Sequence, residues 1–272
     1  VIDQAGSGGD YHDQEAGHWI LDSKISTPMS TYSDFKNSRT SFGINVMKSI
    51  VVEVEASDGS IGVSTGQGGA PACYMIEQHF RRFIVGLDPR DINKAWDQMY
   101  RSSMYYGGKG LPMWAISVVD LALWDLLGQL RQEPVYKMIG GAVRDEIELY
   151  CTGIRPDVAK DAGFIGGKMP LPFAPVDRNK GLKANVEHFQ KMRDKVGPDF
   201  WLMADCWMSL DVPYAVELAN AMREVDLYWI EEALHPGDMD GHKLLKERAP
   251  SMRWTTGEHE YTRYGFRKLI ET

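Results

Sequence analysis

Three short apolar segments in the last part of the chain each end in an acidic residue. Asp205 and Glu231 are 26 residues apart, Glu231 and Glu258 are 27 apart, and a segment with helical periodicity separates each pair. One strand-plus-helix unit of a parallel barrel has about this length, and barrel active sites lie where the strands end. The spacing therefore predicts that the three acids occupy equivalent places on consecutive strands.

Carboxylates at the ends of neighbouring parallel strands converge, because adjacent strands lie about 5 Å apart. Three carboxylate oxygens are a ligand set that Mg²⁺ takes, at about 2.0–2.1 Å. We predict Asp205, Glu231 and Glu258 as Mg²⁺ ligands. The alternative, that they cap the following helices, explains neither the strand ends nor the repeat. Glu232 competes with Glu231, but neighbours on a strand point to opposite faces, so we expect Glu232 to face the helix layer.

The second half of the chain alternates strand and helix patterns five times, which predicts parallel strands with right-handed crossovers. A barrel is favoured over an open sheet because acids end successive strands and no glycine-rich phosphate loop follows the first one. A full barrel needs about 250 residues, so we expect about five βα units and a longer parent protein. The predicted strands are 146–151, 163–170, 201–207, 228–232 and 253–259, and the predicted helices are 157–162, 181–196, 212–225, 242–248 and 264–270.

The first half has a different pattern. Residues 3–41 are polar and irregular and predict a long loop. A β-hairpin is expected next, from 44–55 and 61–65 around Asp58-Gly59. Helices are predicted at 71–84, 91–100 (capped by Asp88 or Asp91) and 113–130, where Asp120 and Asp125 interrupt an apolar stripe and are expected to be structural anchors. We therefore expect an α+β domain over 1–140 and a partial TIM-type barrel over 141–272.

Composition narrows the classes of partner. The net charge of −8 over 272 residues argues against nucleic acid. No apolar run is long enough to predict a membrane span, so we expect no membrane partner. The three cysteines are far apart, with no disulfide or zinc spacing, which favours a reducing, cytoplasmic location. A bound metal still allows an acidic protein to bind an anionic substrate.

A metal at such a site can hold a substrate carboxylate and neutralise the charge that appears when a proton leaves the adjacent carbon. A base is also needed, and the sequence offers several candidates. Lys168 ends the second predicted strand and His259 follows the third acid, while His12 and His18 lie in the amino-terminal loop. A single histidine is more often a surface or core residue, but together at one barrel mouth they gain weight.

Several motifs resemble a known family. The segment Ala115-Ile-Ser-Val-Val-Asp-Leu-Ala-Leu-Trp-Asp-Leu-Leu-Gly128 resembles the signature helix of the enolase superfamily, in its mandelate-racemase-like branch, and the three strand-end acids resemble that branch's Mg²⁺ ligands. The segments around His12, Arg39 and Gly-Glu-His259 are similar to sugar-acid dehydratases of the branch. The resemblance covers essentially the whole chain.

The resemblance implies a capping domain over the barrel mouth, with His12 and Arg39 as substrate contacts, and a homo-oligomer. It also implies proton removal next to a sugar-acid carboxylate, a metal-stabilised enolate, and loss of the neighbouring hydroxyl as water. The family's base is a histidine on the seventh strand, oriented by an aspartate on the sixth, and both would follow residue 272. Lys168 is then the alternative base or a charge near the site, and His259 touches substrate or leaving group.

Other readings stay open at this point. In one alternative, the protein dehydrates or racemises a different sugar acid. In another, it is an inactive member or fragment of the family that serves as a binding protein. Three intact acids argue against an inactive site, because converging carboxylates repel one another without a metal.

Overall fold

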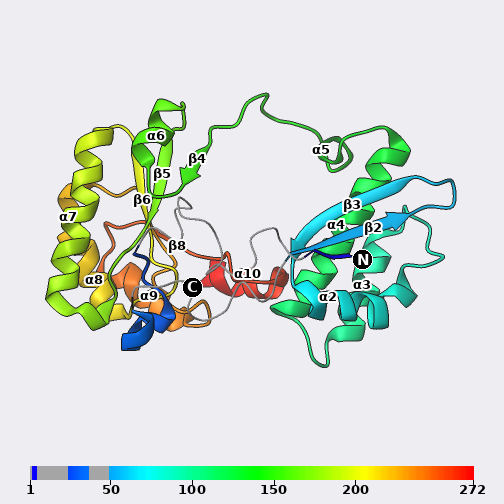
Figure 1. Ribbon diagram of the computed structural model, residues 1–272, viewed down its shortest axis with the longest axis horizontal. Helices are drawn as coiled ribbons and strands as arrows, with labels where there is room; N and C mark the ends of the chain where they lie inside the picture. The colour runs from blue at the N-terminus through cyan, green and yellow to red at the C-terminus, as the bar shows by residue number, and fades with distance from the viewer. Residues whose placement is uncertain (1, 5–23, 37–48) are drawn as a thin grey trace. The chain divides into compact units, whose positions relative to one another are not determined.

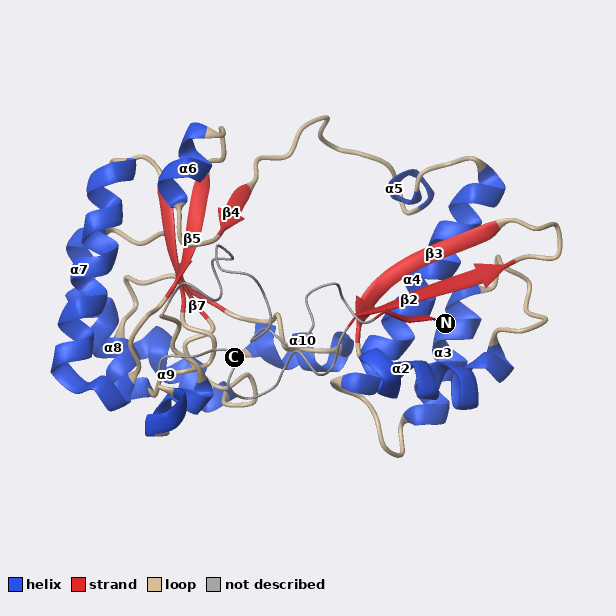
Figure 2. Ribbon diagram, viewed as in Figure 1, coloured by secondary structure: helices blue, strands red, loops and turns tan. Residues whose placement is uncertain are grey.

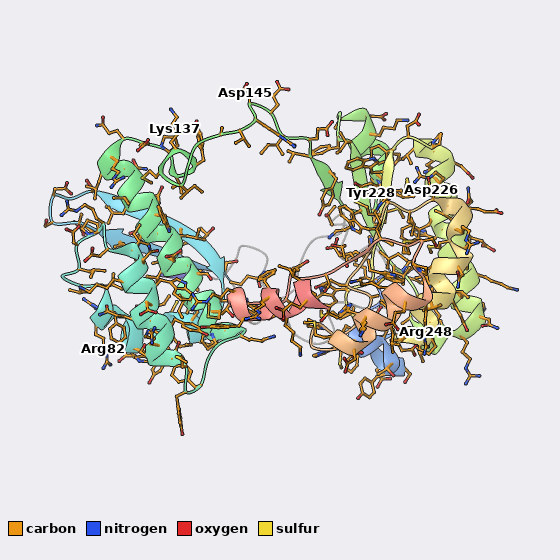
Figure 3. All side chains as sticks on the ribbon, turned by 180° about the vertical axis from the view of Figure 1, so that it is seen from behind. Arg82, Lys137, Asp145, Asp226, Tyr228 and Arg248 are labelled. Carbon is orange, nitrogen blue, oxygen red and sulfur yellow. The ribbon has the colours of Figure 1, made fainter. Side chains whose placement is uncertain are left out.

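The computed structural model describes residues 2–4, 24–36 and 49–272. The chain forms two compact units, one from residues 1–13 and 44–146 and the other from 14–43 and 147–272. Residues 139–150, around the division, are exposed, and Figure 3 shows the Asp145 side chain directed away from the ribbon. The predicted substrate contacts His12 and Arg39, and the candidate base His18, lie outside the described residues.

The first unit contains an antiparallel sheet in the order β1-β2-β3, formed by Ile2–Gln4, Ser49–Glu55 and Ile61–Gln67. The hairpin of β2 and β3 is confirmed. The loop predicted over 3–41 is wrong at two places. Strand β1 pairs with Ser49–Val51, and two 3-10 helices, η2 (Pro28–Thr31) and η3 (Ser33–Phe35), lie in the described part of that range. None of these three short elements carries a recognisable period.

The helices of the first unit lie close to their predicted positions. The stretch predicted as one helix over 71–84 is divided into α2, a π-helix η6 and a 3-10 helix η7. Asp91 is the N-cap of α3 without a side-chain hydrogen bond, and the Asp88 carboxylate instead accepts the Arg90 N–H. The bounds are Gly69–Met75 for α2, Ile76–Phe80 for η6, Arg81–Phe83 for η7, Ile92–Ser103 for α3, Leu111–Arg131 for α4 and Val135–Met138 for α5.

Helix α4 packs directly on β3, and Figure 1 shows the helix lying along one face of the hairpin. Alternate positions of β3 are small, so the two backbones approach closely. Ser64 donates a hydrogen bond to the Val118 carbonyl, and the Asp125 carboxylate accepts the Val63 N–H at 2.8 Å. Asp125 is therefore a structural anchor, as the sequence predicted.

Gly62 is the point of closest approach, and we expect Gly62→Ala to lower the free energy of unfolding by about 1–3 kcal/mol, the usual cost of overpacking. An added Cβ would lie 2.2 Å from the Ala122 carbonyl oxygen and 2.4 Å from the Leu126 nitrogen, which are backbone atoms that cannot turn away. Urea unfolding measures the effect. Gly153→Ala is the control, because its Cβ meets no atom within 4 Å; equal stability of the two variants would contradict the close packing.

The expectation that no apolar run is long enough for a membrane span is wrong for helix α4, which is long and apolar enough to cross a membrane by length and composition alone. However, 56% of its apolar window is buried inside the protein, as expected of a core helix. Asp120 is a half-buried carboxyl group on this helix. Burial raises its pKa from 3.8 to about 6. The folded state therefore favours the neutral carboxylic acid.

This shift predicts a pH-dependent effect of Asp120→Asn. A raised folded-state pKa means that the wild type loses stability as pH rises from about 4 through about 6. The variant carries no such charge, so it should be more stable than wild type at pH 7–8 by roughly 1–2 kcal/mol, after discounting for partial exposure. The two proteins should be nearly equal at about pH 4. Thermal melts across this range measure the difference, and a difference independent of pH would contradict the argument.

The second unit contains a parallel sheet in the order β4-β5-β6-β7-β8, with a helix after each strand. This confirms the predicted partial barrel of five βα units, and Figure 2 shows helices α7 and α8 along one side of the strands. The strands are Tyr150–Thr152, Gly166–Pro170, Trp201–Asp205, Ile230–Glu231 and Trp254–Thr255, and the helices α6 to α10 are Pro156–Asp161, Arg178–Val196, Val212–Ala221, Met239–Arg248 and Thr262–Glu271. Short 3-10 helices lie at Pro175–Asp177 and Arg223–Val225.

The described segment 24–36 belongs to this second unit, whereas the sequence placed it in a domain over 1–140. The Ser26 N–H donates to the Leu171 carbonyl at 2.8 Å, and the Ser26 and Ser209 hydroxyl oxygens lie 2.7 Å apart. Lys36 also forms an ion pair with Asp177 at 2.7 Å. Each of these contacts joins residues more than 140 positions apart, so local sequence patterns do not reveal them.

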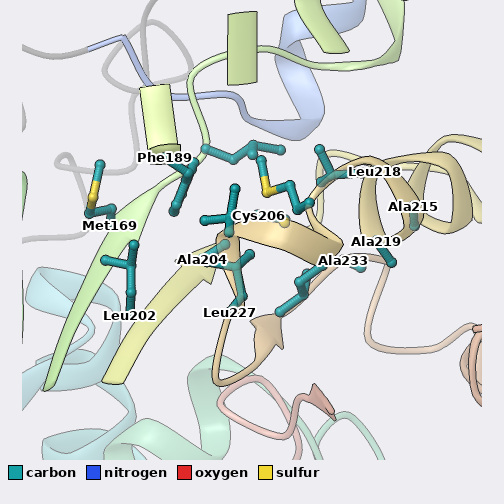
Figure 4. Close-up of a cluster of buried hydrophobic side chains, with 14 of the residues drawn as sticks. Met169, Phe189, Leu202, Ala204, Cys206, Ala215, Leu218, Ala219, Leu227 and Ala233 are labelled. Atoms are coloured by element: carbon teal, nitrogen blue, oxygen red, sulfur yellow. The ribbon is translucent and has the colours of Figure 1, made fainter. Parts of the chain in front are cut away.

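Alternation along β6 separates the helix-packed face from the site. Leu202, Ala204 and Cys206 are buried in the cluster between strands and helices, where they lie with Phe189 of α7 and Leu218 of α8 (Figure 4). Because side chains alternate along a strand, residues 203 and 205 project to the opposite face. Asp205 therefore lies on the face away from the helices.

Candidate active site

Asp205 and Glu231 end two neighbouring parallel strands at the same level. Asp205 of β6 is paired in register with Glu231 of β7, so their side chains project to the same face. Lys168, the central residue of β5, reaches both carboxylates. Its Nζ lies 3.2 Å from Asp205 Oδ2 and donates a short hydrogen bond to Glu231 Oε1. The structure therefore brings together two predicted ligands and one predicted catalytic residue.

A second donor orients each carboxylate. The backbone N–H of Trp207 donates to Asp205 Oδ1 at 3.1 Å. The indole Nε1–H of Trp229 donates to Glu231 Oε2 at 3.0 Å. The two acids are thus held from both sides, by Lys168 and by these donors.

The ammonium and carboxylate charges are largely buried. Lys168 is 6% exposed and Glu231 is 9% exposed. Burial alone lowers the pKa of Lys168, but Asp205 and Glu231 together outweigh it and hold that pKa above its ordinary value. Burial raises the pKa of Glu231, and the attraction of Lys168 opposes this only in part. The site therefore favours a cation beside its carboxylates.

Glu232 and His259 form a second pair. The strand alternation ends at Glu232, whose φ of +45° turns the chain. Its Oε1 lies 2.7 Å from His259 Nδ1, and its buried Oε2 has no hydrogen-bond partner among the described residues. The bond to Glu232 raises the pKa of His259. We expected Glu232 to face the helix layer; its carboxylate instead reaches the turn after β8.

Glu258 lies in that turn rather than on a strand, because β8 ends at Thr255. Its side chain is exposed, unlike that of Glu231. Over residues 2–4, 24–36 and 49–272, no group of three histidine, cysteine or acidic side chains is placed close enough to hold a metal ion. The structure assembles Asp205 and Glu231, whereas the ligand role of Glu258 stays a prediction.

The chemistry of the two assembled donors fits Mg²⁺. Both are carboxylates, the hard oxygen ligands that this ion prefers, and their strands are adjacent. The Lys168 ammonium lies between them and shows that the site stabilises positive charge there. Magnesium would be held by Asp205 and Glu231, with Glu258 as the third predicted ligand.

Sequence reasoning missed the role of Trp229. Trp229 lies two residues before Glu231, so the two-residue period of a strand indicates that both side chains lie on one face of the chain. Its hydrogen bond to Glu231 depends on side-chain rotamers, which that period does not fix.

Two family models match the chain. The N-terminal domain of the mandelate racemase and muconate lactonizing enzymes matches residues 24–140, and the enolase C-terminal domain-like family matches residues 154–272. The chain belongs to the mandelate racemase and muconate lactonizing enzyme family, with an N-terminal domain and an enolase-type barrel domain.

Particular relatives are closely similar. L-Rhamnonate dehydratase of Saccharopolyspora erythraea is 56% identical over 98% of this chain and 68% of its own length. The crystal structure of rhamnonate dehydratase from Gibberella zeae complexed with Mg is also 56% identical, with a TM-score of 0.94 over 100% of this chain and 67% of that one. A racemase from Streptomyces coelicolor A3(2) with bound magnesium is 30% identical, with a TM-score of 0.75 over 82% and 65%. The chain spans about two thirds of the length of these relatives.

Proposed function

We propose that the protein is a Mg²⁺-dependent L-rhamnonate dehydratase, a hydro-lyase that converts L-rhamnonate to 2-dehydro-3-deoxy-L-rhamnonate and water. The single observation that carries this is the pair of carboxylates, Asp205 and Glu231, around the buried ammonium group of Lys168, in a chain 56% identical to L-rhamnonate dehydratase. By the family resemblance of the segments around them, we assign His12 and Arg39 to substrate binding.

Each residue of the site has a distinct task. Asp205, Glu231 and Glu258 hold Mg²⁺, which when bound supplies positive charge to the substrate carboxylate as the neighbouring proton leaves. Lys168 adds a positive charge beside two of these ligands. We assign His259, whose Nδ1 lies 2.7 Å from Glu232 Oε1, to contact with the substrate or with the departing hydroxyl group, to which an imidazolium can give a proton. The base that takes the α-proton is, by the family resemblance, a histidine on a later strand.

Racemisation of a sugar acid is the second candidate, since it begins with the same proton removal and a racemase with bound magnesium is 30% identical. The two reactions differ in product. Dehydration gives a 2-keto-3-deoxy acid, whereas racemisation keeps every oxygen atom and inverts one carbon.

The natural protein that contains this chain should be incubated with Mg²⁺ and a panel of sugar acids that includes L-rhamnonate, D-gluconate and D-galactonate. We expect a 2-keto-3-deoxy product, detected as its semicarbazone, to form fastest from L-rhamnonate and to disappear when the metal is chelated. An epimerised sugar acid, or no turnover of L-rhamnonate, would overturn the assignment.

We further propose a cytoplasmic homo-oligomer. No disulfide joins the cysteines Cys73, Cys151 and Cys206 to one another, which fits a reducing compartment. The family resemblance supports association of identical chains. Light scattering on the natural protein tests the oligomer, and a monomer at micromolar concentration would contradict it.

A further inference from the structure

Trp229 touches the Glu231 carboxylate but is neither charged nor a possible metal ligand. Its indole Nε1–H donates to Glu231 Oε2 at 3.0 Å, while Lys168 donates to Oε1 of the same group. Because the indole of tryptophan can only donate a hydrogen bond, the Glu231 carboxylate is always the acceptor here. The two oxygens of Glu231 are therefore fixed separately, one by an ammonium and one by an indole.

Aromatic neighbours hold the indole ring of Trp229 in place. Tyr150 of β4 meets it edge to face, with ring centroids 5.4 Å apart and an interplanar angle of 85°. Tyr228 lies against it at 5.2 Å and is itself stacked on Trp201 at 4.1 Å. The Arg253 guanidinium covers Tyr228 at 4.7 Å. The ring is thus packed directly against Tyr150 of β4 and, through Tyr228, against Trp201 of β6, so it has little freedom to turn away from Glu231.

A carboxylate oxygen has two lone pairs, so one that accepts a hydrogen bond keeps another for a cation. The indole N–H therefore fixes the plane of the Glu231 carboxylate and leaves one lone pair of Oε2 for a cation. Without this donor, the group would have to be ordered at the moment of metal binding, which costs free energy.

We propose that Trp229 is a positioning residue that sets the orientation of the Glu231 carboxylate for Mg²⁺. The proposal rests on the assignment of Glu231 as a metal ligand within the proposed function. Hydrogen-bond partners of metal ligands typically change metal affinity 10- to 100-fold when removed. We expect the indole N–H of Trp229 to have an effect in this range.

The test compares two tryptophan variants by titration calorimetry of the natural protein with Mg²⁺ alone. Trp229→Phe removes the N–H and is expected to raise the Kd for Mg²⁺ about 10- to 100-fold. Trp254→Phe is the matched control, because its Nε1–H donates to the Ala249 carbonyl at 3.3 Å and not to a carboxylate. We expect its Kd to change less than about twofold.

A second variant separates the hydrogen bond from ring packing. Benzothienylalanine at position 229 keeps the bicyclic ring but replaces the N–H by sulfur, so it should weaken Mg²⁺ binding as Trp229→Phe does. Wild-type Mg²⁺ affinity in this variant would overturn the proposal. A wild-type protein that binds Mg²⁺ but does not dehydrate L-rhamnonate would instead overturn the proposed function and leave the role of Trp229 standing.

Discussion

Glu231→Gln should abolish measurable Mg²⁺ binding and lower dehydratase turnover by about 10³-fold or more. The substitution keeps the size of a side chain that is 9% exposed, but it removes the charge that pairs with a cation. A bound metal contributes several kcal/mol of charge stabilisation, and each 1.36 kcal/mol corresponds to a factor of ten in rate. Loss of one charged ligand therefore has a large expected effect on rate with little effect on packing.

The measurement is calorimetric Mg²⁺ titration together with product formation from L-rhamnonate. Glu217→Gln removes the same charge from the exposed face of helix α8 rather than from a strand end, and it should leave both readouts unchanged. Near wild-type Mg²⁺ binding by Glu231→Gln would refute the ligand assignment and point to Glu232 in its place.

Lys168→Met should lower the free energy of unfolding of the metal-free protein by about 3–5 kcal/mol. Removal of the ammonium leaves Asp205 and Glu231 close together with no compensating cation, in a site where Lys168 is 6% exposed. Saturating Mg²⁺ should restore part of this loss, because a ligand that binds only the folded state stabilises it. The restoration distinguishes a charge effect from a packing defect.

Urea unfolding with and without Mg²⁺ provides the measurement. Lys183→Met is the matched control, since Lys183 is exposed on α7, and its stability should differ from wild type by less than about 0.5 kcal/mol. A loss below 1 kcal/mol in Lys168→Met, or one that Mg²⁺ does not reduce, would show that Lys168 does not neutralise the two carboxylates.

The order of strands and helices was largely predictable because it depends on local periodicity. The five βα units, the hairpin and helix α4 all lie close to their predicted positions. Strand β1 was not predicted, since its three residues pair with Ser49–Val51, far along the chain. The predicted last strand over 253–259 was too long, because Gly257, with φ of +123°, already turns the chain after Thr255.

The sequence by itself determined the class of this protein and the position of Asp205 and Glu231 at equivalent strand ends. The repeat from Asp205 to Glu231 follows from the length of a βα unit, and parallel register then sets both on one face. Only the tertiary structure decided which side chains meet there. Lys168 lies between Asp205 and Glu231, Glu232 reaches His259, and Glu258 is left exposed in a turn. These partners come from strands up to 63 residues apart, so they depend on lateral register and side-chain rotamers, and no local period of the sequence encodes either.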